Sequence, residues 1–375
     1  VQFAFYGGYC FMAIPAAIFI KKYSFKSGIL VGLALYALGG ILFIPASLIG
    51  LFYPFCAAFF IMTCGLSFLE TSANPYILSM GDADTATRRL NLAQSFNPMG
   101  SIIGILVAKE FILGRMNPAS STERAQMATD AFEAVKMADL AIVRGPYVAI
   151  GLVIVVMFAL IAFTPMPKGQ EAGNKLDLAG TFRRLMQNLR YREGVLAQAF
   201  YVGAQITVWT YTIHYGTEVL MSEGMAEGEA AAQAVNFNFY AMILFAVSRF
   251  VCTFLLKYID SGRLLMYLAI GGVVLLIPVI FVGGRIGLYA LVGISGCMSL
   301  MFPTIYGIAL EGLTDDAKLG AAGLVMAIAG GSFLPPIQGL LLDRVGVQLS
   351  YLIPVLCFIA IAVYGFRMFR LGQQN

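Results

Sequence analysis

Glu70 is a single carboxylate near the middle of an apolar stretch that runs from about residue 53 to residue 78. An ionised side chain at that depth of a bilayer costs about 3 kcal/mol on insertion scales, so it usually has a function. Asn74 follows one turn later on the same helical face. Pro75 lacks an N–H group and leaves a carbonyl of the preceding turn without its helical partner. A buried acid that can be neutralised at modest cost is what proton-coupled transport requires.

Amide side chains follow in the next apolar stretch. Gln94 and Asn97 are three residues apart, and Asn91 and Ser101 continue the same helical face. An amide offers hydrogen-bond donors and acceptors, which suits the hydroxyl groups of a sugar. The alternative is a hydrogen bond between helices, a common role of polar side chains in membranes. We predict sugar contact foremost for Gln94 and Asn97, with Asn74 beside them.

A second polar stripe lies in residues 194–219, where Gln198, Tyr201, Gln205 and Trp209 share one helical face. Trp209 is the only tryptophan in the chain. Its ring could stack on the apolar face of a sugar while the two glutamines bind hydroxyl groups. A place in the aromatic belt at the membrane surface is an equally good interpretation of Trp209.

Three other polar residues lie within apolar stretches. His214 could titrate near physiological pH, but its place towards the outer end of a stretch favours a solvated or packing role. Arg249 lies about two turns before the basic end of its stretch, which favours a gate-side ion pair or a side chain that reaches out to the surface. Gln338, near Pro335 and Pro336, is a weaker candidate for a cavity wall.

Composition defines the class of protein. Hydrophobic residues make up 59% of the chain and charged residues 12%, against about 25% charged in a soluble domain. The mean hydropathy is +0.83. Apolar runs of about 20 residues recur throughout, each long enough to cross a bilayer as a helix. We predict an all-α, multi-pass membrane protein.

Metal, disulfide and catalytic sites are not predicted. The six cysteines all lie inside apolar runs, where they fit as small buried hydrophobic residues: Cys10, Cys56, Cys64, Cys252, Cys297 and Cys357. No phosphate-binding loop or nucleophile triad is present, so we predict no cofactor, no metal and no enzymatic activity.

Eleven membrane spans are predicted, at about 2–20, 28–50, 53–78, 90–108, 146–165, 194–219, 235–256, 264–282, 286–310, 320–342 and 349–368. Two connections are long: 109–145, which is polar, and 166–193, which is basic. Of the 24 Lys and Arg residues, sixteen fall on the side of the C-terminus and seven on the other, which places the C-terminus in the cytoplasm. The chain begins on the outer side with an odd number of spans, so one preceding helix is expected, for twelve in all.

The basic connection then joins two halves, residues 1–165 and 194–375. Residues Gly65 to Leu90 weakly resemble Gly296 to Leu319, as expected of the parallel repeats found in transporters. Within 166–193, an apolar stripe with arginines beside it predicts a helix lying along the cytoplasmic surface, and a disordered linker is the alternative. The stripe consists of Leu178, Phe182, Leu185 and Leu189.

Specific motifs resemble the paired signatures of the fucose:proton symporter family of the major facilitator superfamily. They are Leu69-Glu70-Thr71-Ser72-Ala73-Asn74-Pro75-Tyr76, Arg89-Leu90-Asn91-Leu92-Ala93-Gln94-Ser95-Phe96-Asn97, Tyr201-Val202-Gly203-Ala204-Gln205, Pro303-Thr304-Ile305 and Leu352-Ile353-Pro354. The similarity extends over nearly the whole chain.

The resemblance implies import of a hexose such as L-fucose across the cytoplasmic (inner) membrane, driven by protons, by a monomer in the lipid bilayer. It implies that Glu70 exchanges the coupled proton and that Gln94 and Asn97 face the central cavity. A second acid of the family belongs to the expected first helix. His214 stands where the best-known fucose importers are expected to have Arg, which leaves other hexoses open.

Other cargoes and one other class remain possible at this stage. The sugar could be glucose, galactose or an N-acetylated hexose. A sugar sensor without transport is a different class, which the absence of a signalling domain in this sequence disfavours. A proton-coupled drug exporter would more commonly present a broad apolar cavity than this set of amides.

Overall fold

The computed structural model describes residues 2–117, 119, 123–124, 126–166, 177–313 and 316–373. All regular structure within these ranges is helical, which confirms the predicted all-α class. The chain divides into two compact units. One comprises residues 1–73 and 100–168, and the other comprises residues 74–99 and 169–375.

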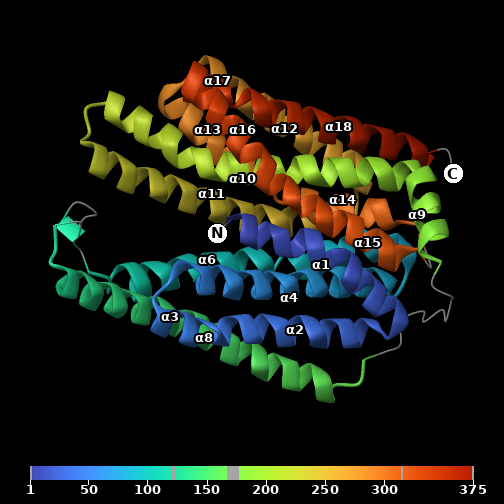
Figure 1. Cartoon of the computed structure of the whole chain (residues 1–375). Helices are drawn as coiled ribbons and strands as arrows, with labels where there is room; N and C mark the ends of the chain where they lie inside the picture. Colours follow the sequence, from blue (N-terminus) through green and yellow to red (C-terminus); the bar gives the residue numbers. More distant parts are fainter. Residues whose placement is uncertain are drawn as a thin grey trace. The chain divides into compact units, whose positions relative to one another are not determined.

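The described residues of the first part of the chain form seven α-helices with a short 3₁₀ turn (Ala83–Thr85) and a π-helical segment (Ala108–Leu113) between them. The α-helices are α1 (Gln2–Lys22), α2 (Phe25–Ile41), α3 (Phe43–Ile49), α4 (Phe52–Ser79), α5 (Ala86–Gln94), α6 (Asn97–Val107) and α8 (Thr129–Phe163). α2 and α8 pack against each other within the first unit (Figure 1).

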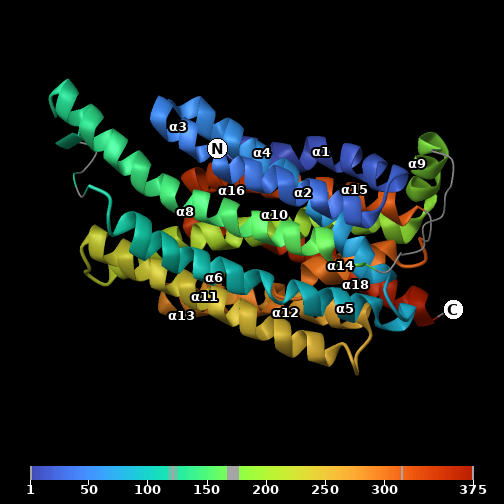
Figure 2. The ribbon, with the colours of Figure 1, turned by 90° about the horizontal axis from the view of Figure 1, so that it is seen from below.

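The rest of the described chain contains α9 (Leu178–Gln187), α10 (Leu189–Ser222), α11 (Glu227–Leu255), α12 (Ser261–Phe281), α13 (Gly284–Met298), α14 (Met301–Leu310), α15 (Ala317–Met326), a 3₁₀ turn (Ala327–Ala329), α16 (Gly330–Val345), α17 (Val347–Ser350) and α18 (Leu352–Gln373). α10 is central to the second unit, where it packs against α11, α13, α14, α16 and α18. Figure 2 shows α11 and α13 side by side.

The helices follow the predicted spans with three kinds of difference. Spans 28–50, 90–108, 286–310 and 320–342 are each broken into two helices. The prediction that residues 109–145 form a connection between spans is wrong for residues 129–145, because α8 begins at Thr129. Residues 129–145 include four alanines, the residue that most favours helix. The predicted linker ends early, because α10 begins at Leu189. Eight helical segments of the described chain are long and apolar enough to span a membrane.

α9 confirms a helix in the basic connection. The disordered-linker alternative is wrong for residues 178–187, while residues 167–176 lie outside the described part. The expected apolar stripe is not uniformly buried: Leu185 is buried and Phe182 is exposed. Arg184 donates from Nε and Nη2 to the Asp316 carboxylate at 2.8 Å each, which ties α9 to the turn before α15.

Glycines bring α2 and α4 into backbone contact in the first unit. A Cβ at Gly32 would lie 2.9 Å from the Gly65 carbonyl oxygen, and one at Gly65 would lie 2.6 Å from the Gly32 carbonyl oxygen. A Cβ at Gly28 would likewise lie only 2.4 Å from Oγ of Ser72. Gly28 and Gly32 on α2 therefore allow a close approach to α4.

Gly100 and Gly104 on α6 have the same spacing as Gly28 and Gly32 but do not contact a neighbouring helix in this way within the described part of the chain. Among the described residues, nothing lies within 4 Å of a Cβ placed on Gly100 or Gly104. The spacing of two glycines alone thus does not say which helical face meets a neighbour.

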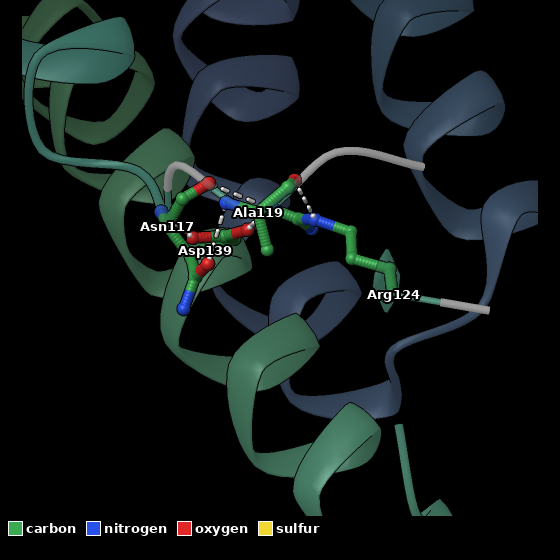
Figure 3. Close-up of polar contacts among 4 residues, drawn as sticks. All are labelled: Asn117, Ala119, Arg124 and Asp139. Carbon is green, nitrogen blue, oxygen red and sulfur yellow. Dashed lines mark hydrogen bonds and ion pairs between the residues drawn. The ribbon is translucent and has the colours of Figure 1, made fainter. Parts of the chain in front are cut away.

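A buried carboxylate organises the connection that precedes α8 (Figure 3). Asp139 accepts the backbone N–H of Asn117 at 2.9 Å and the Arg124 guanidinium at 2.7 Å. Arg124 also donates to the carbonyl oxygens of Asn117 (2.8 Å) and Ala119 (3.0 Å). One acid on α8 thus holds the described part of this connection against the helix.

Replacement of Gly65 by Ala should lower the free energy of unfolding by about 1–3 kcal/mol, because the added methyl group must push two backbones apart. Gly104→Ala is the matched control. It should leave stability unchanged or raise it by up to about 1 kcal/mol, since Ala favours helix over Gly. Melting temperatures of the purified protein in detergent measure both. Equal melting temperatures for the two variants would contradict the α2–α4 contact.

Asp139→Ala should expose the connection to trypsin. The partly buried ion pair and the Asn117 N–H lose their acceptor, so cleavage after Arg124 should become about tenfold faster. Asp130→Ala, which removes an exposed acid in the first turn of α8, should leave that rate unchanged. Cleavage is followed on membranes by mass spectrometry of the released peptides, and unchanged cleavage in Asp139→Ala would refute the anchoring role.

Candidate functional site

Glu70 lies inside α4, nine residues before its last residue, Ser79, and its side chain is half-buried. It lies within electrostatic range of the phenol of Tyr9, a buried residue of α1. Tyr9 was not singled out from the sequence, although a tyrosine within the apolar stretch 2–20 was a visible signal. The structure therefore gives the predicted acid a polar neighbour inside an apolar helix pair.

α4 continues through Pro75 to its end. Because proline has no N–H, the Thr71 carbonyl four residues earlier receives no helical hydrogen bond from it. The Thr71 hydroxyl is also buried without a hydrogen-bond partner in the described structure. Polar groups around Glu70 are thus less completely paired than is usual in a helix interior.

An amide pair lies one turn after the acid. The Gln94 side chain donates from Nε2 to Oδ1 of Asn74 at 2.9 Å. Asn74 is buried and Gln94 is half-buried. This bond joins α4 to the last residue of α5, and it brings together two of the residues that the sequence predicts to bind sugar.

Asn97 begins α6, directly after the break that separates it from α5. Its side chain is exposed, although it stands in the middle of a predicted span. An amide facing hydrocarbon would be costly, so this position fits a water-filled or sugar-filled space.

Asn91 takes the alternative role. Its Nδ2 donates to Oγ1 of Thr304 on α14 at 3.1 Å and to the Thr87 carbonyl at 2.9 Å. The side chain is fully buried. A hydrogen bond between helices is therefore observed for Asn91.

The stripe on α10 divides into two kinds of residue. Gln198 is fully buried, and neither polar atom of its side chain has a hydrogen-bond partner in the described structure. Gln205 and Trp209 are half-buried. The indole Nε1 of Trp209 donates to Ser295 Oγ at 3.2 Å, and its ring meets Phe245 edge-on at 5.1 Å.

The position of Trp209 weighs against the aromatic belt. It lies 13 residues before the end of α10 at Ser222, or about 20 Å along the axis at 1.5 Å per residue. Belt residues lie at the ends of spans, close to the membrane surface. The ring is thus held within the helix bundle of the second unit.

Arg249 differs from one of its two predicted environments, and the other, a gate-side ion pair, stays a prediction. The side chain is 4% exposed, so the interpretation as a residue that reaches out to the surface is wrong. Its Nε donates to the Ser299 carbonyl at 2.5 Å and its Nη1 to the Gln94 carbonyl at 2.9 Å. Burial at this depth followed from helix packing, which the sequence pattern did not reveal.

The other candidates have simpler environments. His214 is exposed and lies 5.7 Å from the Tyr211 ring, in line with a solvated role. Gln338 is buried and donates to Ser350 Oγ at 3.2 Å, which favours a packing role. Among the residues described, no three His, Cys, Asp or Glu side chains are grouped as a metal site would need.

Comparison with known proteins identifies relatives of the whole chain. The family model described as Major Facilitator Superfamily matches residues 1–331. An L-fucose-proton symporter of Haemophilus influenzae is 48% identical over 99% of this chain and 88% of its own length. A glucose/galactose transporter of Brucella abortus is 32% identical over 97% of this chain and 84% of its own length.

A solved structure agrees with these relatives. The crystal structure of the Escherichia coli fucose:proton symporter is similar to this chain with a TM-score of 0.90 and 35% sequence identity. The match covers 98% of this chain and 89% of that one. The chain therefore belongs to the fucose:proton symporter family of the major facilitator superfamily.

Proposed function

We propose that this protein is a proton-coupled symporter that imports a hexose, foremost L-fucose, across the cytoplasmic membrane by alternating access. One observation carries the proposal beyond family membership. A half-buried carboxylate in an apolar helix, Glu70, is followed one turn later by the hydrogen-bonded amides of Asn74 and Gln94. A proton-accepting group and the Asn74 amide thus share α4, and Gln94 on α5 is hydrogen-bonded to that amide.

Glu70 carries the coupled proton. Protonated, its carboxyl group is neutral and can remain in an apolar wall, whereas the ionised form needs water or a polar partner. Binding and release of this proton therefore change whether the Glu70 side chain on α4 is stable in an apolar wall or needs a polar environment. That difference links the proton gradient to the direction in which the site opens.

Gln94, Asn97 and Asn74 bind the hydroxyl groups of the sugar. A hexose presents donors and acceptors in close succession, which paired amides can match in both senses. Gln205 and Trp209 form a second wall, where the held indole ring offers a flat surface for the apolar face of the sugar. Gln198 is sealed in this conformation and would reach a sugar only after α10 and its neighbours rearrange.

Eleven membrane crossings follow if three further elements are counted with the eight long apolar segments. These are α1, the α5–α6 pair and α10. Residues 1–165 and 194–375 form the two halves, residues 166–193 connect them, and α9 within this connection lies along the cytoplasmic surface. The protein works as a monomer in the lipid bilayer.

A glucose/galactose symporter is the second candidate. The Brucella abortus transporter of that description is 32% identical to this chain. His214, where Arg was expected for a fucose importer, leaves room for this cargo. Proton-driven uptake of radiolabelled L-fucose in the presence of competing hexoses separates the two. Binding of a sugar without any flux would instead indicate a sensor.

Glu70→Gln should abolish accumulation of sugar against its gradient, because the amide cannot exchange a proton. Exchange of labelled for unlabelled sugar across proteoliposomes needs no net proton movement and should persist. Glu218→Gln, an exposed acid on α10, is the control and should accumulate sugar normally. Gradient-driven accumulation by Glu70→Gln at the wild-type level would show that the proton is carried elsewhere.

Gln94→Ala should raise the KM for uptake by about tenfold, because one or two hydrogen bonds worth about 1–1.5 kcal/mol are lost. Gln187→Ala, an exposed amide at the end of α9, should leave KM unchanged. Initial rates over a range of L-fucose concentrations provide both values. An unchanged KM for Gln94→Ala would remove this residue from the sugar site.

A further inference from the structure

Arg249 is an arginine buried within a membrane-spanning helix. A guanidinium group is costly to bury in a bilayer unless its charge and its donors are satisfied. Two of its protein acceptors, at 2.5 and 2.9 Å, are backbone carbonyls, those of Ser299 and Gln94. Phe245 supports the group from one side, with its ring centroid 4.5 Å away.

Both carbonyls stand at helix breaks. Gln94 is the last residue of α5, and Ser299 directly follows the last residue of α13. The final carbonyls of a helix have no partner within it, and the C-terminal end carries the negative end of the helix dipole. A rigid cation with several donors is well suited to join two such ends. Arg249 thus satisfies two breaks that would otherwise be costly inside the membrane.

The contact continues along α5 and α14, which pack against each other (Figure 2). One turn further, Asn91 donates to Thr304 at 3.1 Å. Beyond it, a Cβ on Gly307 would lie 2.6 Å from Oγ1 of Thr87, so the helices touch there as well. We call this row of contacts, from Arg249 through Asn91 to Gly307, the α5–α14 seam.

A cavity of about 410 Å³ lies at the far end of the seam. Its lining includes Thr87 and Arg88 of α5, Gly307 of α14, and Arg190. The arginines belong to the side that the charge count predicts to be cytoplasmic. The seam therefore begins where this cavity ends and extends from it towards Gln94.

Gln94 belongs to the seam and to the amide pair at once. Its backbone carbonyl accepts from Arg249, and its side chain donates to Asn74. Any movement of the α5 end away from Arg249 must shift the Gln94 side chain. Closure of the seam and the geometry of the sugar-binding amide are thus mechanically linked.

We infer that Arg249 is a positioning residue: it holds the end of α5 on the α13–α14 break, and this clasp keeps the cytoplasmic side closed while it orients Gln94 for the sugar. The inference rests on the proposed function for the identity of the sugar. Opening towards the cytoplasm requires Arg249 to release the Gln94 carbonyl, which releases the sugar-binding amide in the same step.

A native cysteine reports on the clasp without any sugar. Cys252, one turn after Arg249 on α11, is 6% exposed, and its sulfur lies 3.9 Å from Oγ of Ser299. Arg249→Lys keeps the positive charge but replaces the planar fork by a single point donor. In membranes treated with N-ethylmaleimide, Cys252 should react about three- to tenfold faster in Arg249→Lys, as expected for a shifted equilibrium between two states.

Cys357 on α18 is 2% exposed and serves as the internal control. Mass spectrometry of the labelled peptides reports both cysteines in one sample. Faster labelling of Cys252 with unchanged Cys357 supports the clasp. Equal acceleration of both would mean general loosening and would overturn the positioning role, as would an unchanged rate for Cys252.

Transport kinetics provide the second measurement. If the closed state is less populated, the apparent KM for external L-fucose in Arg249→Lys should rise about three- to tenfold, since affinity falls with the competent fraction. The maximal rate should change less than about twofold. A raised KM with normal Cys252 labelling would instead make Arg249 a direct sugar contact and overturn the clasp.

Asn91→Ala is the second variant should Arg249→Lys fail to fold. It removes the next contact of the seam and should accelerate Cys252 labelling in the same sense, and no acceleration would overturn the seam. If the wild-type protein transports no hexose at all, the proposed function fails. The labelling rates of Cys252 and Cys357 still decide whether the clasp exists.

Discussion

In a bilayer no water reaches the polar groups of a helix, so each amide, carboxylate and backbone carbonyl inside the membrane has to find a partner within the protein. This constraint explains most of the polar contacts described above. Asn91 binds Thr304, Trp209 binds Ser295, and Gln338 binds Ser350, each across a helix boundary. Glu70 and Gln94 are only half-buried, which fits the proton and sugar binding proposed for them.

The same constraint governs the broken helices. A break leaves terminal carbonyls without partners, which is acceptable only where another group approaches them. At the ends of α5 and α13 that group is Arg249. The buried arginine thus supplies donors to backbone carbonyls that the helix breaks leave without helical partners. It thereby joins α5 and α13, which are far apart in the sequence.

Close packing is the second requirement for a bundle of helices in lipid. α2 and α4 meet backbone to backbone at Gly32 and Gly65. Without a hydrophobic driving force between helices in lipid, such close approach supplies the attraction. Gly100 and Gly104 have the same spacing as Gly28 and Gly32. Among the described residues, however, nothing lies within 4 Å of a Cβ added to either, so the motif permits contact without ensuring it.

The sequence by itself determined the class, the approximate positions of the long apolar helices and the family, because long apolar runs and short specific motifs are local in the chain. It also identified Glu70, Gln94 and Asn97 as candidates, since polar residues are conspicuous in apolar surroundings. Their roles in sugar and proton binding remain proposals. The sequence missed the start of α8, where helix-forming residues were mixed with charges.

Only the tertiary structure decided which polar residues meet each other. Gln198 and Gln205 are equivalent in the sequence stripe, yet one is sealed and the other half-buried. Arg249 was predicted to form a gate-side ion pair or to reach out to the surface, and the structure shows it buried and bound to two distant carbonyls. Helical periodicity fixes the direction of a side chain relative to its own axis, whereas burial depends on which neighbour occupies that direction.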